Sequence, residues 1–345
     1  MRKFCTSRNA FIMLLLCFIS FSIELTAKTV LVSTETVQNS ISPDSLLRGP
    51  EMTDVVVKTI GSEEVKIFYL KPTDYKLGEK RTAVVWIHGG GWTGGSTESF
   101  FLHARYFAFR GAVGFCIQYR LVKANGTTVA DCVADCKSTI RYIREHAAEL
   151  GIDPDKIVVM GDSAGGHLAS CLGTIDGFDD PTDNLKISAK PNAMVLYNPL
   201  SDFTTSVFIN RIIAGAALDK KPTPESQIPT KEQTELAKKL SPLYNIHKNQ
   251  PPTLVMHGTD DTVILPEQSL QFTEAMKKAG NSCKLILLPN TTHAFVCANW
   301  KAPEEVVVSA IREADKFLIS LGLLKGEPTL MVSKIPAWIP KGQKK

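Results

Sequence analysis

The sequence predicts an α/β domain built on a mostly parallel sheet of about eight strands, with helices on both faces. Short apolar runs of strand length alternate with segments of helical length from residue 83 onward, and the runs are continuously apolar. A pattern of two further strands joined by a tight turn precedes them. Continuous apolar strands separated by helices are typical of a parallel sheet that is buried on both faces.

The expected strands begin with an antiparallel edge hairpin over 54–60 and 65–70, because Gly61-Ser62 lies between two runs rich in valine and isoleucine. The six later strands follow one another along the chain and supply the parallel part of the sheet. They are expected at 83–88, 112–119, 157–160, 193–197, 253–257 and 284–288.

The expected helices fill the gaps between these strands. The clearest covers about 129–150, where five apolar residues recur at spacings of 4, 3, 4 and 3 and therefore share one face. Gly151 is expected to end this helix, and Asp153-Pro154 to make the turn into the next strand. The others are expected at 98–109, 164–173, 266–279 and 303–321.

We expect one large domain over 51–323, with a polar extension at 28–50 before it and an appended tail at 324–345 after it. Two segments, 174–191 and 201–252, do not fit the alternation and are expected to be insertions above the sheet. The first is rich in aspartate, but its spacing lacks the ordered ligand pattern of a calcium loop. It is therefore expected to be a solvated acidic turn.

Residues 1–27 have the layout of a secretory signal peptide. Arg2, Lys3 and Arg8 precede an apolar run over 11–23, and the small residue Ala27 offers a cleavage site. The run is shorter than the roughly 20 residues that span a bilayer, so we expect no stable membrane span after cleavage; an uncleaved anchor is the alternative. The expected location is secreted or periplasmic.

Composition and charge exclude several classes of protein. The chain of 345 residues is 44% hydrophobic and 21% charged, which excludes disordered, collagen-like and coiled-coil proteins. The formal net charge is +4, and removing three basic residues and one acidic residue with the leader leaves +2. The remaining lysine pairs are scattered, so no nucleic-acid partner is expected. The sequence gives no indication of oligomeric state.

Six cysteines lie outside the leader, an even number that permits disulfides in an exported chain. Cys283 and Cys297 flank a strand and the loop after it, so they are the first candidate pair; burial as small apolar residues is the alternative. The sequence contains no Cys-x-x-Cys and no histidine-rich ligand spacing. We therefore expect no metal site and no cofactor.

A nucleophile motif follows the expected strand 157–160. Gly161-Asp162-Ser163-Ala164-Gly165-Gly166 matches Gly-x-Ser-x-Gly where a strand turns into a helix. Such a turn strains the serine backbone, and the flanking glycines remove side chains that would collide with neighbouring chain. The Ser163 oxygen would then lie at a helix N-terminus, where amide N–H groups favour negative charge. The alternative is a glycine-rich turn with an N-cap serine.

A second glycine motif, His88-Gly89-Gly90-Gly91-Trp92, follows the expected strand 83–88. Backbone N–H groups of such a loop can point into a cavity and hold the oxyanion of an acyl-transfer intermediate. A phosphate-binding loop is the competing interpretation, but no Gly-Lys-Ser or Gly-Lys-Thr follows, and no acidic residue typical of a dinucleotide fold is present.

With these two motifs in this order, the sequence resembles the α/β-hydrolase family, specifically its hormone-sensitive-lipase-like and acetyl-esterase-like carboxylesterases. The resemblance covers roughly residues 65–323. It implies an α/β-hydrolase fold and a serine nucleophile, followed by an acid and then a histidine, each after a late strand. Lipase-like relatives carry a helical N-terminal cap, but 28–50 is polar and interrupted by proline, so a small or absent cap is expected.

The resemblance points to Asp261 and His293 as the partners of Ser163. In similar enzymes, a His-Gly-Thr-x-Asp segment places the acid fourth after the histidine, which selects Asp261 and leaves Asp260 as the neighbour to test. His293 alone combines a late loop with the correct chain order. Among the other histidines, His88 is expected to brace the glycine loop, and His103 is expected to be peripheral.

These residues imply two-step acyl transfer through an acyl-enzyme. The expected oxyanion donors are the N–H groups of Gly89, Gly90 and Ala164, with Gly91 positioning the loop. An open site would suit short-acyl esters, either small molecules or acetyl and feruloyl esters of polysaccharide. The aromatic residues considered as substrate neighbours, with core packing as the alternative, are Trp92, Tyr119, Tyr197 and Phe295.

Two other functions use the same fold. A prolyl-oligopeptidase-like peptidase or amidase shares the three catalytic groups, but the sequence shows no propeller. A non-catalytic binding protein could keep the fold alone, although every expected catalytic residue is present here. The sequence therefore favours a serine carboxylesterase.

Overall fold

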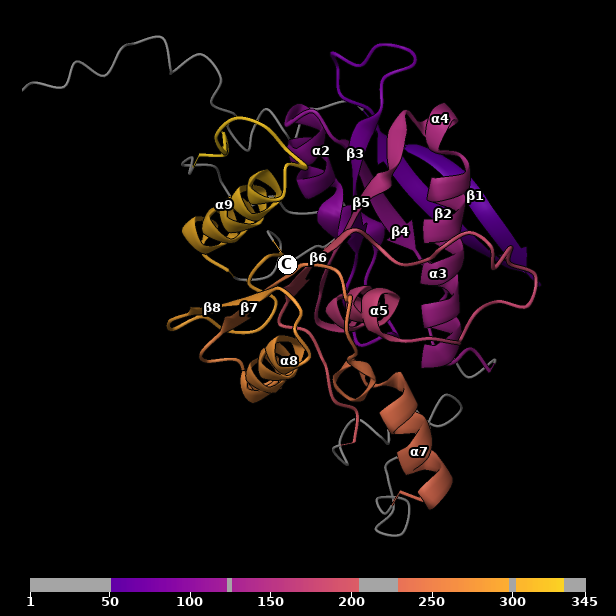
Figure 1. The fold of residues 1–345 in the computed structure, drawn as a ribbon, viewed down its shortest axis with the longest axis vertical. Helices are drawn as coiled ribbons and strands as arrows, with labels where there is room; N and C mark the ends of the chain where they lie inside the picture. Colours follow the sequence, from indigo (N-terminus) through magenta and orange to yellow (C-terminus); the bar gives the residue numbers. More distant parts are fainter. Residues whose placement is uncertain (1–50, 123–125, 205–228, 298–301, 332–345) are drawn as a thin grey trace, which may run out of the picture. The chain divides into compact units, whose positions relative to one another are not determined.

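An eight-stranded sheet runs through the part of the chain that the computed structural model describes, residues 51–122, 126–204, 229–297 and 302–331. The strand order is β1-β2-β4-β3-β5-β6-β7-β8 (Figure 1). Strands β3 to β8 are mutually parallel, whereas β1 and β2 form an antiparallel hairpin that joins the sheet at β4. The strands are β1 (Thr53–Ile60), β2 (Glu63–Leu70), β3 (Arg81–Ile87), β4 (Val113–Gln118), β5 (Ile152–Asp162), β6 (Ala193–Tyr197), β7 (Thr253–Gly258) and β8 (Cys283–Leu288).

Helices cover both faces of this sheet, which confirms the predicted fold class. Helices α2 and α9 lie on one face and α3, α5 and α8 on the other (Figure 1). The described helices are η2 (Thr97–Phe100), α2 (Phe101–Phe109), α3 (Val129–Glu145), α4 (Ala147–Leu150), α5 (Ser163–Thr174), α7 (Lys231–Leu240), η4 (Pro242–Asn245), α8 (Glu267–Lys278) and α9 (Glu304–Ser320). All described residues belong to one unit, Ser40–Lys345.

The alternation of side chains along each strand divides the core into two layers. In β3, Val85 and Ile87 pack with α3 and α5, whereas Val84 and Trp86 pack with α2 and α9. Both sets are fully buried, as expected of a parallel strand covered on two sides. This packing fixes the carboxyl edge of the sheet, where the loops after β3, β5, β7 and β8 meet.

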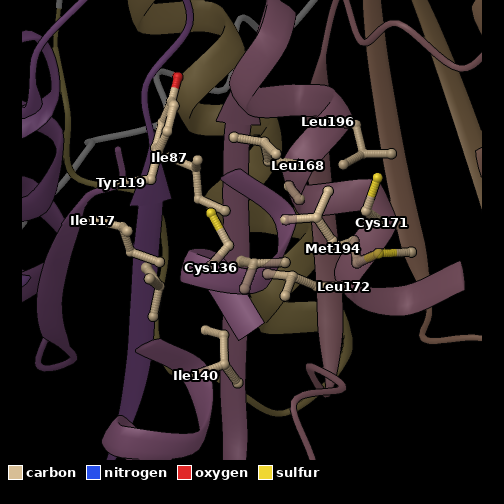
Figure 2. Packing of buried hydrophobic residues seen from close by; sticks show 14 of the residues in the cluster. Ile87, Ile117, Tyr119, Cys136, Ile140, Leu168, Cys171, Leu172, Met194 and Leu196 are labelled. Atoms are coloured by element: carbon tan, nitrogen blue, oxygen red, sulfur yellow. The ribbon is translucent and has the colours of Figure 1, made fainter. Parts of the chain in front are cut away.

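Helix α3 shows why these residues form these elements. Thr128 and Asp131 make reciprocal side-chain bonds to the backbone at its N-terminus, a capping box. One face carries the apolar residues expected from the sequence, and Figure 2 shows Cys136 and Ile140 of this face close to Leu168 and Leu172 of α5. The stripe therefore holds α3 and α5 together above the nucleophile strand.

The acidic segment after α5 is exposed along much of its length, but two of its aspartates bind neighbouring elements. Asp183 accepts bonds from Ser138 at 2.8 Å and from Lys58 at 2.5 Å, and it also pairs with Arg141. Asp179 pairs with Arg141 as well. Helix α3 presents the cationic side chain of Arg141 and the hydroxyl of Ser138 to this segment, and no pattern in the sequence indicates that pairing. The carboxylates therefore clamp residues 175–191 onto α3 and β1.

The chain stays packed beyond the expected domain end at residue 323. Leu324 and Leu330 are buried in the layer that contains α2 and α9. The Arg312 side chain donates to the Leu330 carbonyl at 2.7 Å, and Arg110 donates to the Lys325 carbonyl at 2.9 Å. At least the first part of the expected tail is thus integral to the domain.

The predicted Cys283–Cys297 disulfide is wrong, because both thiols are free, as are the other described cysteines. Cys283 starts β8 and Cys297 lies beyond its other end. Six strand residues span about 20 Å, far more than the Cα separation of about 6 Å in a disulfide. The cysteines are buried or half-buried apolar residues, as in the alternative interpretation.

Several predictions concern residues outside the described ranges. These are the signal peptide at 1–27, the extension at 28–50, much of the 201–252 insertion and the end of the tail. Within the described ranges, none of the helices has both the length and the apolar character needed to span a bilayer.

Candidate active site

Ser163 lies where β5 turns directly into α5. Its φ is +51°, in the left-handed region that a non-glycine residue rarely adopts. The turn needs glycine on both sides. A Cβ at Gly165 would lie 2.1 Å from the Ile87 carbonyl oxygen, and one at Gly161 would lie 2.3 Å from the Gly165 carbonyl oxygen. The sequence thus folds locally into a strained elbow with the serine at its apex.

His293 connects Ser163 to Asp261. Its Nε2 lies 2.9 Å from Ser163 Oγ, and its Nδ1 lies 2.6 Å from Asp261 Oδ2. An ionised carboxylate only accepts, so Nδ1 carries the proton and Nε2 is left to accept from the serine hydroxyl. The structure therefore brings together the three residues that the sequence placed in the loops after β5, β7 and β8.

The carboxylate of Asp261 is almost fully buried and surrounded by donors. Its Oδ1 accepts the backbone N–H groups of Val263 at 2.9 Å and Ile264 at 3.0 Å. Burial alone would raise the pKa of Asp261, but hydrogen bonds from His257 and His293 outweigh it and hold this pKa well below its usual range. Asp260, by contrast, is exposed and accepts from the Thr259 hydroxyl at 2.9 Å.

One of the oxyanion donors predicted in the glycine loop after β3 is wrong. The N–H of Gly89 points to Asp162 and donates to its Oδ1 at 2.8 Å, so it is already engaged. Gly90 and Gly91 follow with φ of +115° and +62°. Neither N–H donates to the described backbone. Ala164 is the second residue of α5 and lies in its first turn, where an N–H has no partner within the helix. The groups available for an oxyanion are therefore those of Gly90, Gly91 and Ala164.

Asp162 joins three parts of the site. Besides the Gly89 amide, its carboxylate faces the Cys297 thiol, which donates to Oδ2 at 3.4 Å. Burial raises the pKa of Asp162. Through these two contacts, Asp162 connects the nucleophile turn with the glycine loop and with the loop that carries His293. The motif showed Asp162, but not these partners.

The histidines around the site have distinct roles. His88 donates through Nδ1 to the Gly89 carbonyl at 2.9 Å and stacks on Tyr119, as expected of a loop brace. His103 is not peripheral: it is fully buried, and its Nε2 bonds the Val296 carbonyl at 2.8 Å, three residues after His293. Burial lowers the pKa of His103 to about 4. No spacing in the sequence pointed to this contact.

The four aromatic residues considered as substrate neighbours are packed inside the protein. Trp92 bonds His167 Nδ1 through its indole N–H at 3.3 Å, and the Tyr119 hydroxyl bonds the His88 carbonyl at 2.9 Å. Tyr197 and Phe295 contact each other in the layer with α2. All four are at most 3% exposed. The structure gives them the core-packing role, the alternative to the substrate-neighbour role that we considered.

A cleft of about 430 Å³ borders the glycine loop at the same edge of the sheet. Its wall includes His88 and Gly95 of that loop. The polar side chains that line it include Ser62, Ser96, Glu98 and Gln118. We call it the polar cleft. Within the described residues, no group of three or more histidine, cysteine or acidic side chains is arranged to hold a metal ion.

Comparison with known proteins places this geometry in a family. The BD-FAE family matches residues 69–276, more than half of the chain, and the dienelactone hydrolase family matches residues 237–318. The chain is 28% identical to the probable isoprenylcysteine alpha-carbonyl methylesterase ICMEL1 of Arabidopsis thaliana, over 62% of this chain and 45% of that protein. It is 25% identical to an acetylxylan esterase of Xylanibacter ruminicola, over 63% and 42%. The chain thus spans about half the length of these curated relatives.

A solved structure matches more completely. Esterase Est2 of Thermogutta terrifontis, with propionate bound, superposes with a TM-score of 0.70 at 35% identity, covering 81% of this chain and 97% of that one. The same esterase phosphorylated by paraoxon gives a TM-score of 0.69. The family match, this likeness and the eight-stranded fold agree. The chain belongs to the BD-FAE family, within the carboxylesterases of α/β-hydrolase fold.

Proposed function

We propose that the protein is a serine carboxylic-ester hydrolase in which Ser163 is the nucleophile, His293 the general base and Asp261 the acid of the triad. One observation carries the proposal: a continuous hydrogen-bonded relay runs from Asp261 through His293 to Ser163, with distances of 2.6 and 2.9 Å. Its serine stands in a strained elbow at the start of a helix. This arrangement matches what acyl transfer requires.

In the first step, His293 Nε2 takes the proton of Ser163 as Oγ attacks the ester carbonyl. Asp261 holds the imidazole in the tautomer that leaves Nε2 free and stabilises the imidazolium that forms. The negative charge on the carbonyl oxygen falls near the N–H groups of Gly90, Gly91 and Ala164. Each such donor is worth on the order of 3 kcal/mol in the transition state.

In the second step, the imidazolium returns its proton to the departing alcohol, and the acyl group stays on Ser163. Water then attacks this acyl-enzyme while His293 accepts its proton; the bond to Ser163 Oγ breaks, His293 returns the proton to Oγ, and the acid is released. Apart from the water and the ester, all groups that these two reaction steps need come from the protein chain. The reaction as proposed uses no cofactor.

We propose short-acyl esters as substrates, either small molecules or acetyl and feruloyl esters of polysaccharide. A relative is an acetylxylan esterase and a structural neighbour holds propionate, which supports a short acyl group. The polar cleft supports a hydroxyl-rich alcohol, because its wall offers hydroxyl, carboxamide and carboxylate groups beside the glycine loop. Export, expected from residues 1–27, would bring the enzyme to such an ester.

A substrate panel tests this function. Rates are measured on p-nitrophenyl esters from acetate to decanoate, on acetylated and feruloylated xylo-oligosaccharides, and on a matched anilide. We expect the highest kcat/KM with acyl groups of two to four carbons and activity on the saccharide esters, and no hydrolysis above background by Ser163→Ala. Preference for decanoate would contradict the short-acyl proposal. A faster anilide would indicate an amidase instead.

A further inference from the structure

A second imidazole contacts the triad carboxylate. His257 lies at the end of β7, four residues before Asp261, and is fully buried. Its Nε2 lies 3.2 Å from Asp261 Oδ2, the oxygen that also bonds His293. The same Nε2 lies 2.8 Å from the Ile264 carbonyl oxygen. Both contacts are on the loop that presents Asp261 to the active site.

The hydrogen-bond partners of His257 show which of its ring nitrogens carries the hydrogen. The Ile264 carbonyl and the ionised Asp261 carboxylate can only accept, so Nε2 carries the hydrogen. The other nitrogen, Nδ1, then has a lone pair, and it lies 2.6 Å from the Ser269 Oγ. Ser269 is fully buried on α8. Its hydroxyl therefore donates to His257, whose Nε2–H donates to the Ile264 carbonyl and lies 3.2 Å from Asp261 Oδ2.

These contacts account for both oxygens of the triad carboxylate. Oδ1 is held by two backbone amides of its own loop, whereas Oδ2 is held by the two imidazoles. The His257 contact ties the loop to buried side chains of β7 and α8. Without it, the described restraints on the carboxylate would be the two amides at Oδ1 and the His293 bond that it has to orient.

We infer that His257, oriented by Ser269, is a positioning residue that fixes the Asp261 carboxylate for its bond to His293. The inference rests on the proposed function, since it assigns His257 a task within that triad. A displacement of a catalytic group by about 1 Å can reduce the rate by about 100-fold. A buried histidine that only fills the core would affect stability and leave the catalytic step unchanged.

Two variants of His257 separate these roles. His257→Gln keeps an N–H donor near the position of Nε2, whereas His257→Leu keeps the bulk and removes the donor. We expect kcat of His257→Leu to fall about 10- to 100-fold with KM changed less than about 2-fold, and His257→Gln to recover most of kcat. If Leu and Gln variants have equal kcat, or if His257→Leu keeps more than half of kcat, the inference is overturned.

Ser269 supplies a milder test that does not depend on the folding of the leucine variant. Ser269→Ala removes the donor that orients His257, and we expect a several-fold loss of kcat. Thr273→Val, one turn along the same helix, removes a buried hydroxyl elsewhere and is expected to keep the wild-type kcat. Equal kcat for these two variants contradicts the inference.

A spectroscopic measurement reports on the bond itself. The proton between His293 Nδ1 and Asp261 Oδ2 is expected to give a low-field ¹H resonance, assigned by its loss in Asp261→Asn. We expect this resonance to shift in His257→Leu and to keep its position in Thr273→Val. An unchanged resonance in His257→Leu contradicts the inference. Activity retained by Ser163→Ala would instead reject the proposed function.

Discussion

The carboxylate of Asp162 accepts the backbone N–H of Gly89 at 2.8 Å, and this bond fixes the glycine loop against the residue that precedes the nucleophile. A Cβ at Gly89 would lie 2.8 Å from Asp162 Oδ2, so the two chain segments touch as closely as packing allows. The Gly89 N–H is thereby engaged, and Gly90 and Gly91 follow with positive φ. The position of the proposed oxyanion donors thus depends on a side chain that takes no part in proton transfer.

Removing this carboxylate should therefore reduce catalysis. We expect Asp162→Ala to lower kcat/KM about 10- to 100-fold, because the loop that holds the oxyanion loses its anchor. Asp162→Asn keeps an oxygen that can accept from Gly89 and should lose less. Steady-state kinetics on p-nitrophenyl acetate measure both, with circular dichroism confirming the fold. Equal activity of all three proteins would refute the anchoring role.

The two neighbouring aspartates after β7 should behave differently. Asp261→Asn leaves the loop in place but removes the acceptor that fixes the His293 tautomer, so we expect kcat to fall about 1,000- to 10,000-fold. Asp260→Asn changes an exposed side chain, and we expect kcat within about 2-fold of wild type. The ratio of the two kcat values decides the assignment. A larger loss in the Asp260 variant would transfer the acid role to that residue.

Two buried histidines should make stability fall in mild acid. Burial lowers the pKa of both His103 and His167 to about 4, whereas an exposed histidine titrates near 6.5. Between these values the unfolded chain binds more protons than the folded one, so stability falls as pH falls. Each histidine should lower the free energy of unfolding by about 2 kcal/mol between pH 7 and pH 5.

Urea unfolding at the two pH values measures this loss. His167→Gln keeps a donor for the Leu240 carbonyl but cannot titrate, so its stability should fall by about 2 kcal/mol less than that of wild type over the same range. An identical pH dependence in wild type and variant would show that His167 does not contribute.

The contact between α3 and α5 should be a main source of stability. Ile140 is fully buried between these helices, so Ile140→Ala should lower the free energy of unfolding by about 2 to 5 kcal/mol. Leu77 is 95% exposed, and Leu77→Ala serves as the control, with an expected change within about 0.5 kcal/mol. Urea or thermal unfolding of the two variants gives the comparison. Similar losses in both would contradict the packing described for α3.

Much of the fold could be predicted from the sequence because buried parallel strands leave an unbroken apolar run. The strand expected at 193–197 is β6 without any change, and the helix expected at 266–279 is α8 to within a residue at each end. The three residues Ser163, Asp261 and His293 and their order along the chain could also be predicted from the sequence motifs. Motif position fixes which loop carries each residue, and the parallel sheet brings those loops to one edge.

The finer organisation of the site could not be predicted, because it depends on which group each hydrogen-bond donor points to. The sequence shows that Gly89 is a glycine, but the orientation of its N–H toward Asp162 follows from how β3 and β5 pair. The contact of His103 with Val296 joins residues 193 apart in the chain, and no local pattern signals it. The aromatic residues near the motifs were considered as substrate neighbours, with core packing as the alternative, and only the packed structure shows that they are buried.

Labelling by paraoxon, the reagent recorded on the Thermogutta terrifontis esterase, tests the central assignment most directly. The protein is treated with a small excess of reagent, and intact mass, peptide mapping and residual esterase activity are followed together. We expect one diethyl phosphoryl group per chain on Ser163, with activity lost in proportion, and neither labelling nor activity in Ser163→Ala. A label on another residue that abolishes activity, or a Ser163→Ala protein that still hydrolyses p-nitrophenyl acetate at the wild-type rate, would contradict it.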